Sequence, residues 1–136
     1  MNALVIPSPI FRELVDQARK QAPIEACGIL GGSGDRVEVF HPMTNTDNSA
    51  DHFLMDPAEQ FKVVKALRTA GQRILAIHHS HPASPARPSA EDIRFSLTPD
   101  VLYTILSLEN AEIPVLKAFA VENGVAKEHP LVIEVQ

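Results

Sequence analysis

Apolar residues recur at helical spacing in two stretches of the chain. The first stretch contains the apolar residues Ile10, Leu14, Val15 and Ala18. These positions share one face of a helix, so the spacing predicts a helix over residues 9–21. Ser8 is the expected N-cap, with Pro9 at the first helical position. A second helix is expected from Asp56-Pro57 to about residue 70, where Gly71 closes it.

Shorter apolar runs predict strands. They cover residues 3–6, 26–30, 36–40, 73–78, 101–108 and 115–121, with two more runs around Val125 and Val132. The stretch from Gly31 to Asp35 predicts a hairpin turn. Residues 41–56 are polar and turn-rich, which predicts a loop with a short strand at His52–Met55, and long loops in small domains are often functional. The order of elements predicts one α/β domain over residues 1–136, with a mixed sheet flanked by helices.

Composition narrows the class of protein. The chain has 136 residues, 45% of them hydrophobic, which suffices for one ordinary core. A net charge of −5 gives no reason to expect a nucleic acid or an anionic membrane as partner. Cys27 is the single cysteine, so no intrachain disulfide can form. Without an export signal or a long apolar run, we expect a cytoplasmic protein, and its oligomeric state is left open.

The chemistry is concentrated in His79-Ser80-His81-Pro82, followed by Ser89 and Asp92. Residues two apart on a strand point to the same face, so His79 and His81 should project together from the end of the buried strand. Asp92 adds a carboxylate from the first turn of a short helix, expected over residues 90–97. Two histidines and one carboxylate, with a fourth position open to water, are typical of a catalytic zinc site.

The same residues also have a purely structural interpretation. Ser89-x-x-Asp92 is the pattern of a helix N-cap with an acidic residue at the third position. Both interpretations are compatible, because a capped helix start is a rigid place to mount a ligand. His78 should point away from His79 and be packed, and Cys27 should be a small buried side chain. The remaining histidines, His41, His52 and His129, are expected in loops or at the surface.

The pattern from His79 to Asp92 resembles the signature of the JAMM (MPN+) metalloprotease family, which includes deubiquitinating subunits and small stand-alone prokaryotic members. The resemblance implies a cytidine-deaminase-like fold and one zinc ion held by His79, His81 and Asp92. Glu25, within Ile24-Glu25-Ala26-Cys27-Gly28, matches the general base of the family. Ser89 matches the serine that supports the oxyanion.

The Glu-x-Cys-Gly segment is similar to that of stand-alone bacterial members associated with ubiquitin-like sulfur-carrier proteins. The expected function is therefore zinc-dependent hydrolysis of the C-terminal tail or conjugate of such a carrier, directly after a Gly-Gly. Two alternatives stay open at this point. One is a metal-free scaffold that only binds partners, and the other is a zinc hydrolase of a small amide or of a cell-wall or phage-tail peptide.

Overall fold

The computed structural model describes residues 2–136, in which the helices lie among the first strands and the chain ends in four consecutive strands. The helices are α1 (Ser8–Gln21), α2 (Pro57–Thr69) and α3 (Ala90–Arg94). The strands are β1 (Leu4–Pro7), β2 (Cys27–Ser33), β3 (Arg36–Met43), β4 (Arg73–His81), β5 (Leu102–Ser107), β6 (Val115–Glu122), β7 (Val125–His129) and β8 (Leu131–Glu134).

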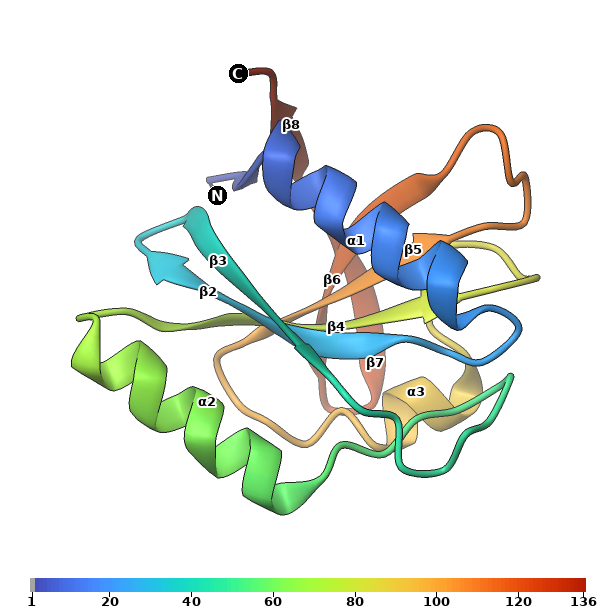
Figure 1. Ribbon diagram of the computed structural model, residues 1–136, viewed down its shortest axis with the longest axis horizontal. Helices are drawn as coiled ribbons and strands as arrows, with labels where there is room; N and C mark the ends of the chain where they lie inside the picture. The colour runs from blue at the N-terminus through green and yellow to red at the C-terminus, as the bar shows by residue number, and fades with distance from the viewer. Residues whose placement is uncertain (1) are drawn as a thin grey trace.

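All of these strands join one mixed sheet, in the order β7-β6-β5-β4-β2-β3-β1-β8. Near the middle of the sheet, β4 pairs antiparallel with β2 and parallel with β5. Only Pro130 separates β7 from β8, although these strands occupy opposite ends of the order. The sheet therefore curls until its two edges meet, like an incomplete barrel (Figure 1). The expected α/β class, with a mixed sheet flanked by helices, is confirmed.

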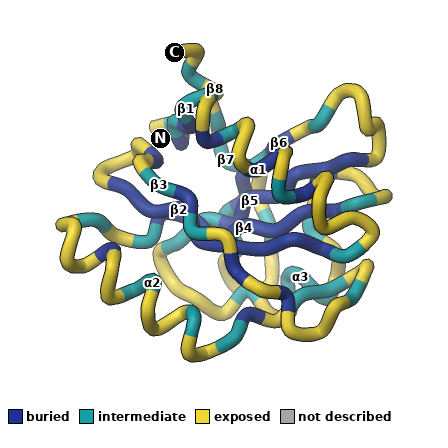
Figure 2. The backbone as a smooth tube through the Cα atoms, in the orientation of Figure 1, coloured by how far each residue is buried: buried dark blue, intermediate teal, exposed yellow. Residues whose placement is uncertain are grey.

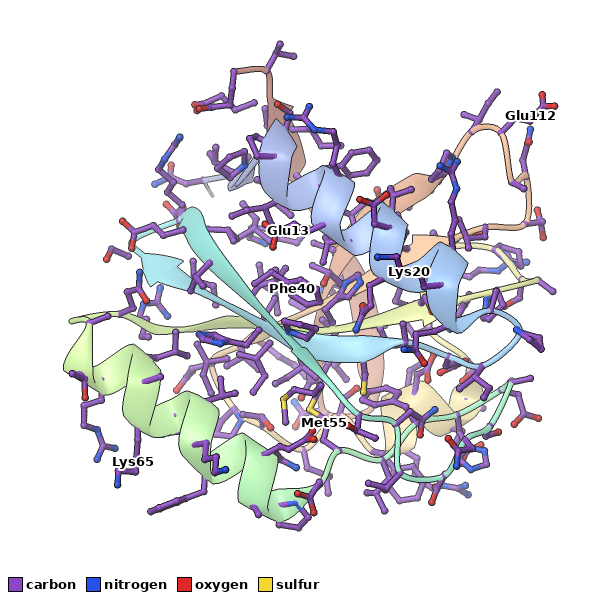
Figure 3. The ribbon with its side chains drawn as sticks, viewed as in Figure 1. Glu13, Lys20, Phe40, Met55, Lys65 and Glu112 are labelled. Atoms are coloured by element: carbon purple, nitrogen blue, oxygen red, sulfur yellow. The ribbon has the colours of Figure 1, made fainter. Side chains whose placement is uncertain are left out.

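The two long helices cover opposite faces of the sheet (Figure 1). All four apolar residues predicted for the inner face of α1 are buried, and they pack in one core with Phe40. On the other face, Leu67 of α2 packs with Ile29, Met43 and Met55. Figure 3 shows Phe40 and Met55 on these opposite sides, and Figure 2 shows that burial is concentrated in the central strands.

The start of α1 differs from the prediction. The helix begins at Ser8 itself, and the N-cap position is Pro7, which makes no side-chain capping bond. Pro7 ends β1, so the chain passes directly from strand to helix, and the Ser8 hydroxyl instead accepts a hydrogen bond from the backbone of Gln136 (3.3 Å). The start of α2 is confirmed, since the Asp56 carboxylate caps it by accepting a bond from the Glu59 N–H.

The predicted turn over residues 31–35 is shorter than expected, because β2 continues to Ser33. A Cβ atom at Gly31 would lie 2.3 Å from Leu67 Cδ2, and one at Gly32 would lie 2.1 Å from the Arg36 carbonyl oxygen. A larger residue at Gly31 would force the Leu67 side chain to move, and one at Gly32 would clash with the backbone of β3. These glycines therefore permit close packing in a strand, and the turn itself is made at residues 34–35.

Three further elements have boundaries that differ from the prediction. The third strand extends to Met43, so His41 lies half-buried in a strand and not in a loop. The strand expected at His52–Met55 is reduced to a single bridge between Asn45 and Met55. The last helix, α3, ends at Arg94 rather than near residue 97.

Within residues 2–136, no helix is long and apolar enough to cross a membrane.

Candidate metal centre and active site

The end of β4 and the start of α3 bring His79, His81 and Asp92 together. The two Nε2 atoms of His79 and His81 lie 3.1 Å apart. The Asp92 Oδ2 atom is 3.2 Å from the first and 3.0 Å from the second. Both imidazoles are buried, and only 8% of the Asp92 side chain is exposed. Three potential metal-binding atoms thus converge on one buried point, as the sequence pattern predicts.

Local structure accounts for this convergence. His79 and His81 alternate with Ser80 along β4, so the two imidazoles share a face. The Ser89 hydroxyl accepts a hydrogen bond from the Asp92 N–H (3.0 Å), and Asp92 Oδ2 accepts one from the Ser89 N–H (2.9 Å). This reciprocal capping box confirms the structural interpretation of Ser89-x-x-Asp92. It also fixes the Asp92 carboxylate in the position where it meets the histidines.

Glu25 lies two residues before β2, the strand that pairs with β4. The Glu25 N–H donates to the Ser49 carbonyl (2.8 Å), and the Glu25 carbonyl accepts a bond from Asn45 Nδ2 (3.0 Å). The next residue, Ala26, donates its N–H to the Ser80 hydroxyl (2.8 Å). The Glu25 side chain reaches the histidines, because ligand atoms of Glu25, His79 and His81 all lie within 4.8 Å of one another.

The donor set fits a metal ion. Glu25 Oε1 is buried without a hydrogen-bond partner, which is costly for a carboxyl group unless a cation or ordered water meets it. His81 Nδ1 lies 2.8 Å from the Pro85 carbonyl oxygen. A carbonyl only accepts, so Nδ1 carries the hydrogen and Nε2 keeps its lone pair, the arrangement usual for a histidine that binds metal. Nitrogen and carboxylate donors of this kind suit zinc.

Burial and charge give these groups different protonation preferences. Burial raises the pKa of Glu25 to about 8, although His81 acts against the change. Burial lowers the pKa of His79 by more than Asp92 raises it. For His81, burial acts in the same direction, but hydrogen bonds to Asp92 and Pro85 outweigh it and the pKa rises. Burial opposes ionisation of Asp92, yet the two imidazoles hold its pKa well below the usual range.

These preferences favour a cation at the site. Asp92 is ionised at neutral pH, whereas the buried Glu25 carboxyl is mostly protonated as long as no further positive charge lies beside it. A divalent cation would stabilise the carboxylate and lower the pKa of Glu25 again. The chemistry of the site thus depends on the cation that its ligand atoms can hold.

His78, Cys27 and His52 lie outside the cluster of metal-binding atoms. His78 is fully buried on the opposite face of β4 from His79, with Nδ1 2.8 Å from the Thr104 hydroxyl, as predicted. Cys27 is also fully buried, as expected for a small packed side chain. The partly exposed His52 lies between Asp47 and Asp51.

Two residues of the loop over residues 44–56 contribute to the site but are not predicted from the sequence. The ring of Phe53 stacks on the imidazole of His79, with centroids 4.7 Å apart and planes 26° apart. The buried Asn45 side chain bonds backbone groups on both sides of the loop, including those of His52 and Leu54. The unusual length of this polar loop was the available signal that it is functional. Its connection to His79 and Glu25 appears only in three dimensions.

An apolar cavity of about 570 Å³ opens beside the metal-binding atoms. Its lining residues come from residues 47–60, from residues 88–98 and from β4, β5 and β6. His79 and Asp92 belong to its lining, so the cavity and the cluster are continuous. The aromatic and aliphatic lining residues are Phe53, Leu54, Met55, Ile77, Phe95, Leu97, Tyr103, Ile105 and Val121.

Comparisons with known proteins agree with this architecture. The family model described as prokaryotic homologs of the JAB domain matches residues 7–121. The CysO-cysteine peptidase of Mycobacterium tuberculosis is 35% identical over 130 residues, which cover 94% of this chain and 89% of that protein. A probable TtuB-protein conjugate cleaving protease of Thermus thermophilus is 37% identical over 92 residues, covering 67% of this chain and 62% of the relative.

Among solved structures, protein DSY2949 from Desulfitobacterium hafniense is 40% identical, with a TM-score of 0.88. The alignment covers 97% of this chain and 93% of that one. The matched region contains β2, β4 and α3, and therefore the whole cluster of Glu25, His79, His81 and Asp92. The chain belongs to the family of prokaryotic JAB-domain proteins and is a hydrolase of the JAMM type.

Proposed function

We propose that this protein is a zinc-dependent peptidase or isopeptidase that cleaves the amide bond after a C-terminal Gly-Gly of a ubiquitin-like sulfur-carrier protein. The observation that carries the proposal is the convergence of His79, His81 and Asp92 within 3.2 Å, with the buried carboxyl of Glu25 beside them. The substrate class is supported by the relatives, since one is named for CysO-cysteine and another for TtuB-protein conjugates.

In this proposal, His79, His81 and Asp92 hold one zinc ion. Bound zinc supplies a Lewis acid that lowers the pKa of water and polarises the scissile carbonyl group. Glu25 takes a proton from the attacking water and later delivers it to the leaving amine, so that no covalent intermediate with the chain is needed.

Ser89 acts on the oxyanion that develops at the carbonyl carbon. Its hydroxyl oxygen accepts the capping bond from the Asp92 N–H, which leaves the hydroxyl hydrogen free to be donated. A single donor of this kind is worth about 10²–10³-fold in turnover. Because the ligand atoms are buried, the substrate backbone must approach closely, and glycines without Cβ atoms permit that approach.

The experiment that tests the proposal combines metal analysis with mass spectrometry of a carrier extended beyond its Gly-Gly. We expect about one zinc per chain and loss of the mass that follows the Gly-Gly. The Glu25→Gln variant, loaded with zinc, is the negative control for trace contaminating protease. A protein that takes up no zinc at neutral pH would contradict the metal assignment. Cleavage of short peptides with carriers left intact would favour a zinc hydrolase of small amides.

A further inference from the structure

The two imidazoles of the metal-binding cluster are held in different ways. His81 Nδ1 lies 2.8 Å from the Pro85 carbonyl oxygen, so a hydrogen bond orients that ring. His79 Nδ1 is buried as well, but no group within residues 2–136 forms a hydrogen bond with it. A metal-binding histidine usually donates its second ring N–H to an acceptor, and that bond orients the ring. Another contact must therefore orient His79.

The ring of Phe53 supplies this contact. It stacks on the His79 imidazole, with the two centroids 4.7 Å apart and the two planes 26° apart. We propose that Phe53 is a positioning residue whose stacking holds the His79 imidazole in the plane in which Nε2 meets the metal, in place of the hydrogen bond that orients His81. This inference rests on the zinc site of the proposed function.

The neighbours of His79 in the sheet offer no substitute for the stack. Cys27 of β2 and Ile105 of β5 are paired with His79 on its two sides, and both are fully buried. Residues paired in this way place their side chains on the same face of the sheet. Ile105 has no polar side-chain atom, and the Cys27 sulfur lies 3.7 Å from the Met43 carbonyl oxygen, to which its S–H donates. A thiol sulfur is in any case a weak acceptor for the His79 N–H.

The loop over residues 44–56 presents Phe53 in a fixed position. Asn45 bonds the residues on either side of Phe53, since its Nδ2 donates to the His52 carbonyl (3.0 Å) and its Oδ1 accepts from the Leu54 N–H (3.2 Å). The Leu54 carbonyl also accepts bonds from the N–H (2.9 Å) and the hydroxyl (3.0 Å) of Thr46. The backbone on both sides of Phe53 is therefore set in advance, and metal binding does not have to order it.

Burial makes the orientation of the His79 ring sensitive to this contact. Only 2% of His79 is exposed, so the ring can tilt only into space that a neighbour vacates. A tilt would move its Nε2 atom away from His81 Nε2 and Asp92 Oδ2, which lie 3.1 Å and 3.2 Å from it. Loss of the aromatic face of Phe53 should consequently weaken zinc binding, although every ligand is still present.

The test compares the zinc affinities of Phe53→Leu, Phe53→Tyr and the unsubstituted protein, measured by competition with a chromophoric chelator at neutral pH. Phe53→Leu should bind zinc about tenfold more weakly, as is typical when a residue that orients a metal ligand is replaced. Phe53→Tyr keeps the aromatic face and should bind zinc within about twofold of the unsubstituted protein. A Phe53→Leu variant of undiminished affinity, or a Phe53→Tyr variant as weak as Phe53→Leu, would overturn the assigned role.

Phe61→Leu is the matched control, because it makes the same exchange at an aromatic residue outside the cluster. Phe61 is 66% exposed on α2, and the Lys65 ammonium lies 5.6 Å from the centroid of its ring. This variant should bind zinc as tightly as the unsubstituted protein. If it weakens binding as much as Phe53→Leu does, the loss does not depend on the stack and the assigned role of Phe53 is wrong.

NMR gives a second readout that does not require a variant to fold. In the unsubstituted protein, nuclear Overhauser effects should connect the ring protons of Phe53 and His79, because the two ring centroids are 4.7 Å apart. An aromatic ring shields protons above its face, so the His79 ring protons should move downfield in Phe53→Leu and return in Phe53→Tyr. Absence of these Overhauser effects, with and without zinc, would overturn the stack.

These measurements are independent of peptide hydrolysis. A Phe53→Leu variant that binds zinc as tightly as the unsubstituted protein overturns the role of Phe53 and leaves the proposed peptidase intact. Zinc-loaded protein that leaves every carrier uncut overturns the proposed peptidase, whereas a difference in zinc affinity between Phe53→Leu and Phe53→Tyr still supports the role of Phe53. If the unsubstituted protein binds no zinc, both proposals fail.

Discussion

Glu25 is unusual among the acidic residues because its carboxyl is almost completely buried, with 3% of the residue exposed. Its Oε1 atom lacks a hydrogen-bond partner, and its pKa is raised to about 8 by burial. An unpaired buried carboxyl reduces stability, so its position is explained by chemistry and not by folding. Asp92 differs, because it is ionised and contacts both imidazoles. The two carboxyl groups should therefore respond differently to substitution.

Removing the charge of Glu25 should separate turnover from metal binding. Glu25→Gln preserves size, so the variant should retain zinc but lose at least about 10²-fold in kcat, as expected for loss of a general base. Asp92→Ala removes a ligand, so its zinc affinity should fall, with activity only partly restored by excess zinc. Zinc titration and steady-state rates measured on the same preparations check both expectations. A Glu25→Gln variant that loses zinc as readily as Asp92→Ala would assign Glu25 to the metal instead.

His78 should make stability depend on pH. Burial lowers its pKa to about 3, whereas a histidine in an unfolded chain titrates near ~6.5. Between these values the unfolded chain binds more protons at this position than the native protein does. The free energy of unfolding therefore falls as the pH drops from about 6.5, by up to ~1.4 kcal/mol per pH unit.

Urea unfolding of the metal-free protein between pH 4.5 and 7, compared with His78→Asn, measures this contribution. Asparagine does not titrate and can still bond the Thr104 hydroxyl, so the stability gap between the two proteins should narrow on acidification. The Thr104→Val variant keeps His78 and should retain the pH slope of the unsubstituted protein. Parallel pH profiles for His78→Asn and the unsubstituted protein would rule out the assigned role of His78.

At the scale of elements, the loop over residues 44–56 connects the parts of the site. It holds the Glu25 backbone at both its N–H and its carbonyl, and it places the Phe53 ring on His79. The Asn45 side chain makes several of the bonds that order the loop, since its Nδ2 donates to the carbonyls of Glu25 and His52 (both 3.0 Å). Its Oδ1 atom accepts bonds from the N–H groups of Asp47 and Leu54. Asn45 thus joins the two sides of the loop, together with the backbone bond from the Thr46 N–H to the Leu54 carbonyl (2.9 Å).

Asn45→Ala should consequently be one of the more damaging polar substitutions in the chain. It leaves several backbone groups unpaired at a buried position, at a cost on the order of 3 kcal/mol in the free energy of unfolding. Asn45→Asp keeps the acceptor but turns a carboxylate oxygen toward the Glu25 and His52 carbonyls at a buried position, so its cost should be at least as large. The control is Asn110→Ala, which removes one bond at an exposed position and should cost less than about 1 kcal/mol. Urea unfolding checks the ranking, and equal costs for the two alanine variants would contradict it.

The features that could be predicted well from the sequence are those that depend on residues close together in the chain. The alternation of His79 and His81, the capping pair Ser89 and Asp92, and the apolar face of α1 all follow from local spacing. Gly31 was misassigned to a turn because its role depends on Leu67, a residue on another element. Phe53, for the same reason, carried no local signal of its contact with His79. Tertiary packing of this kind is absent from any short window of sequence.

At the scale of the whole molecule, the site draws on segments that are distant in the chain. Glu25 precedes β2, the histidines end β4, and Asp92 begins α3, while the loop over residues 44–56 covers them. The central position of β4, between β2 and β5, gives the histidines a rigid base with neighbours on both sides. Because these segments meet only in the folded chain, the metal-binding atoms cannot converge in the unfolded state. Metal binding and folding should therefore be coupled.

Removing the metal should lower the thermal stability of the whole protein. A ligand that binds only the native state adds about 2.7 kcal/mol at a hundredfold excess over its Kd. For a chain of 136 residues, that corresponds to a rise in Tm on the order of 10 °C. Calorimetry with excess zinc and with EDTA measures the shift. Glu25→Gln should keep most of it, because the ligand set of two histidines and Asp92 is intact, whereas Asp92→Ala should lose most of it. A zinc-induced shift that survives Asp92→Ala undiminished would place the stabilising ion elsewhere, and the assignment of Asp92 as a ligand would have to be withdrawn.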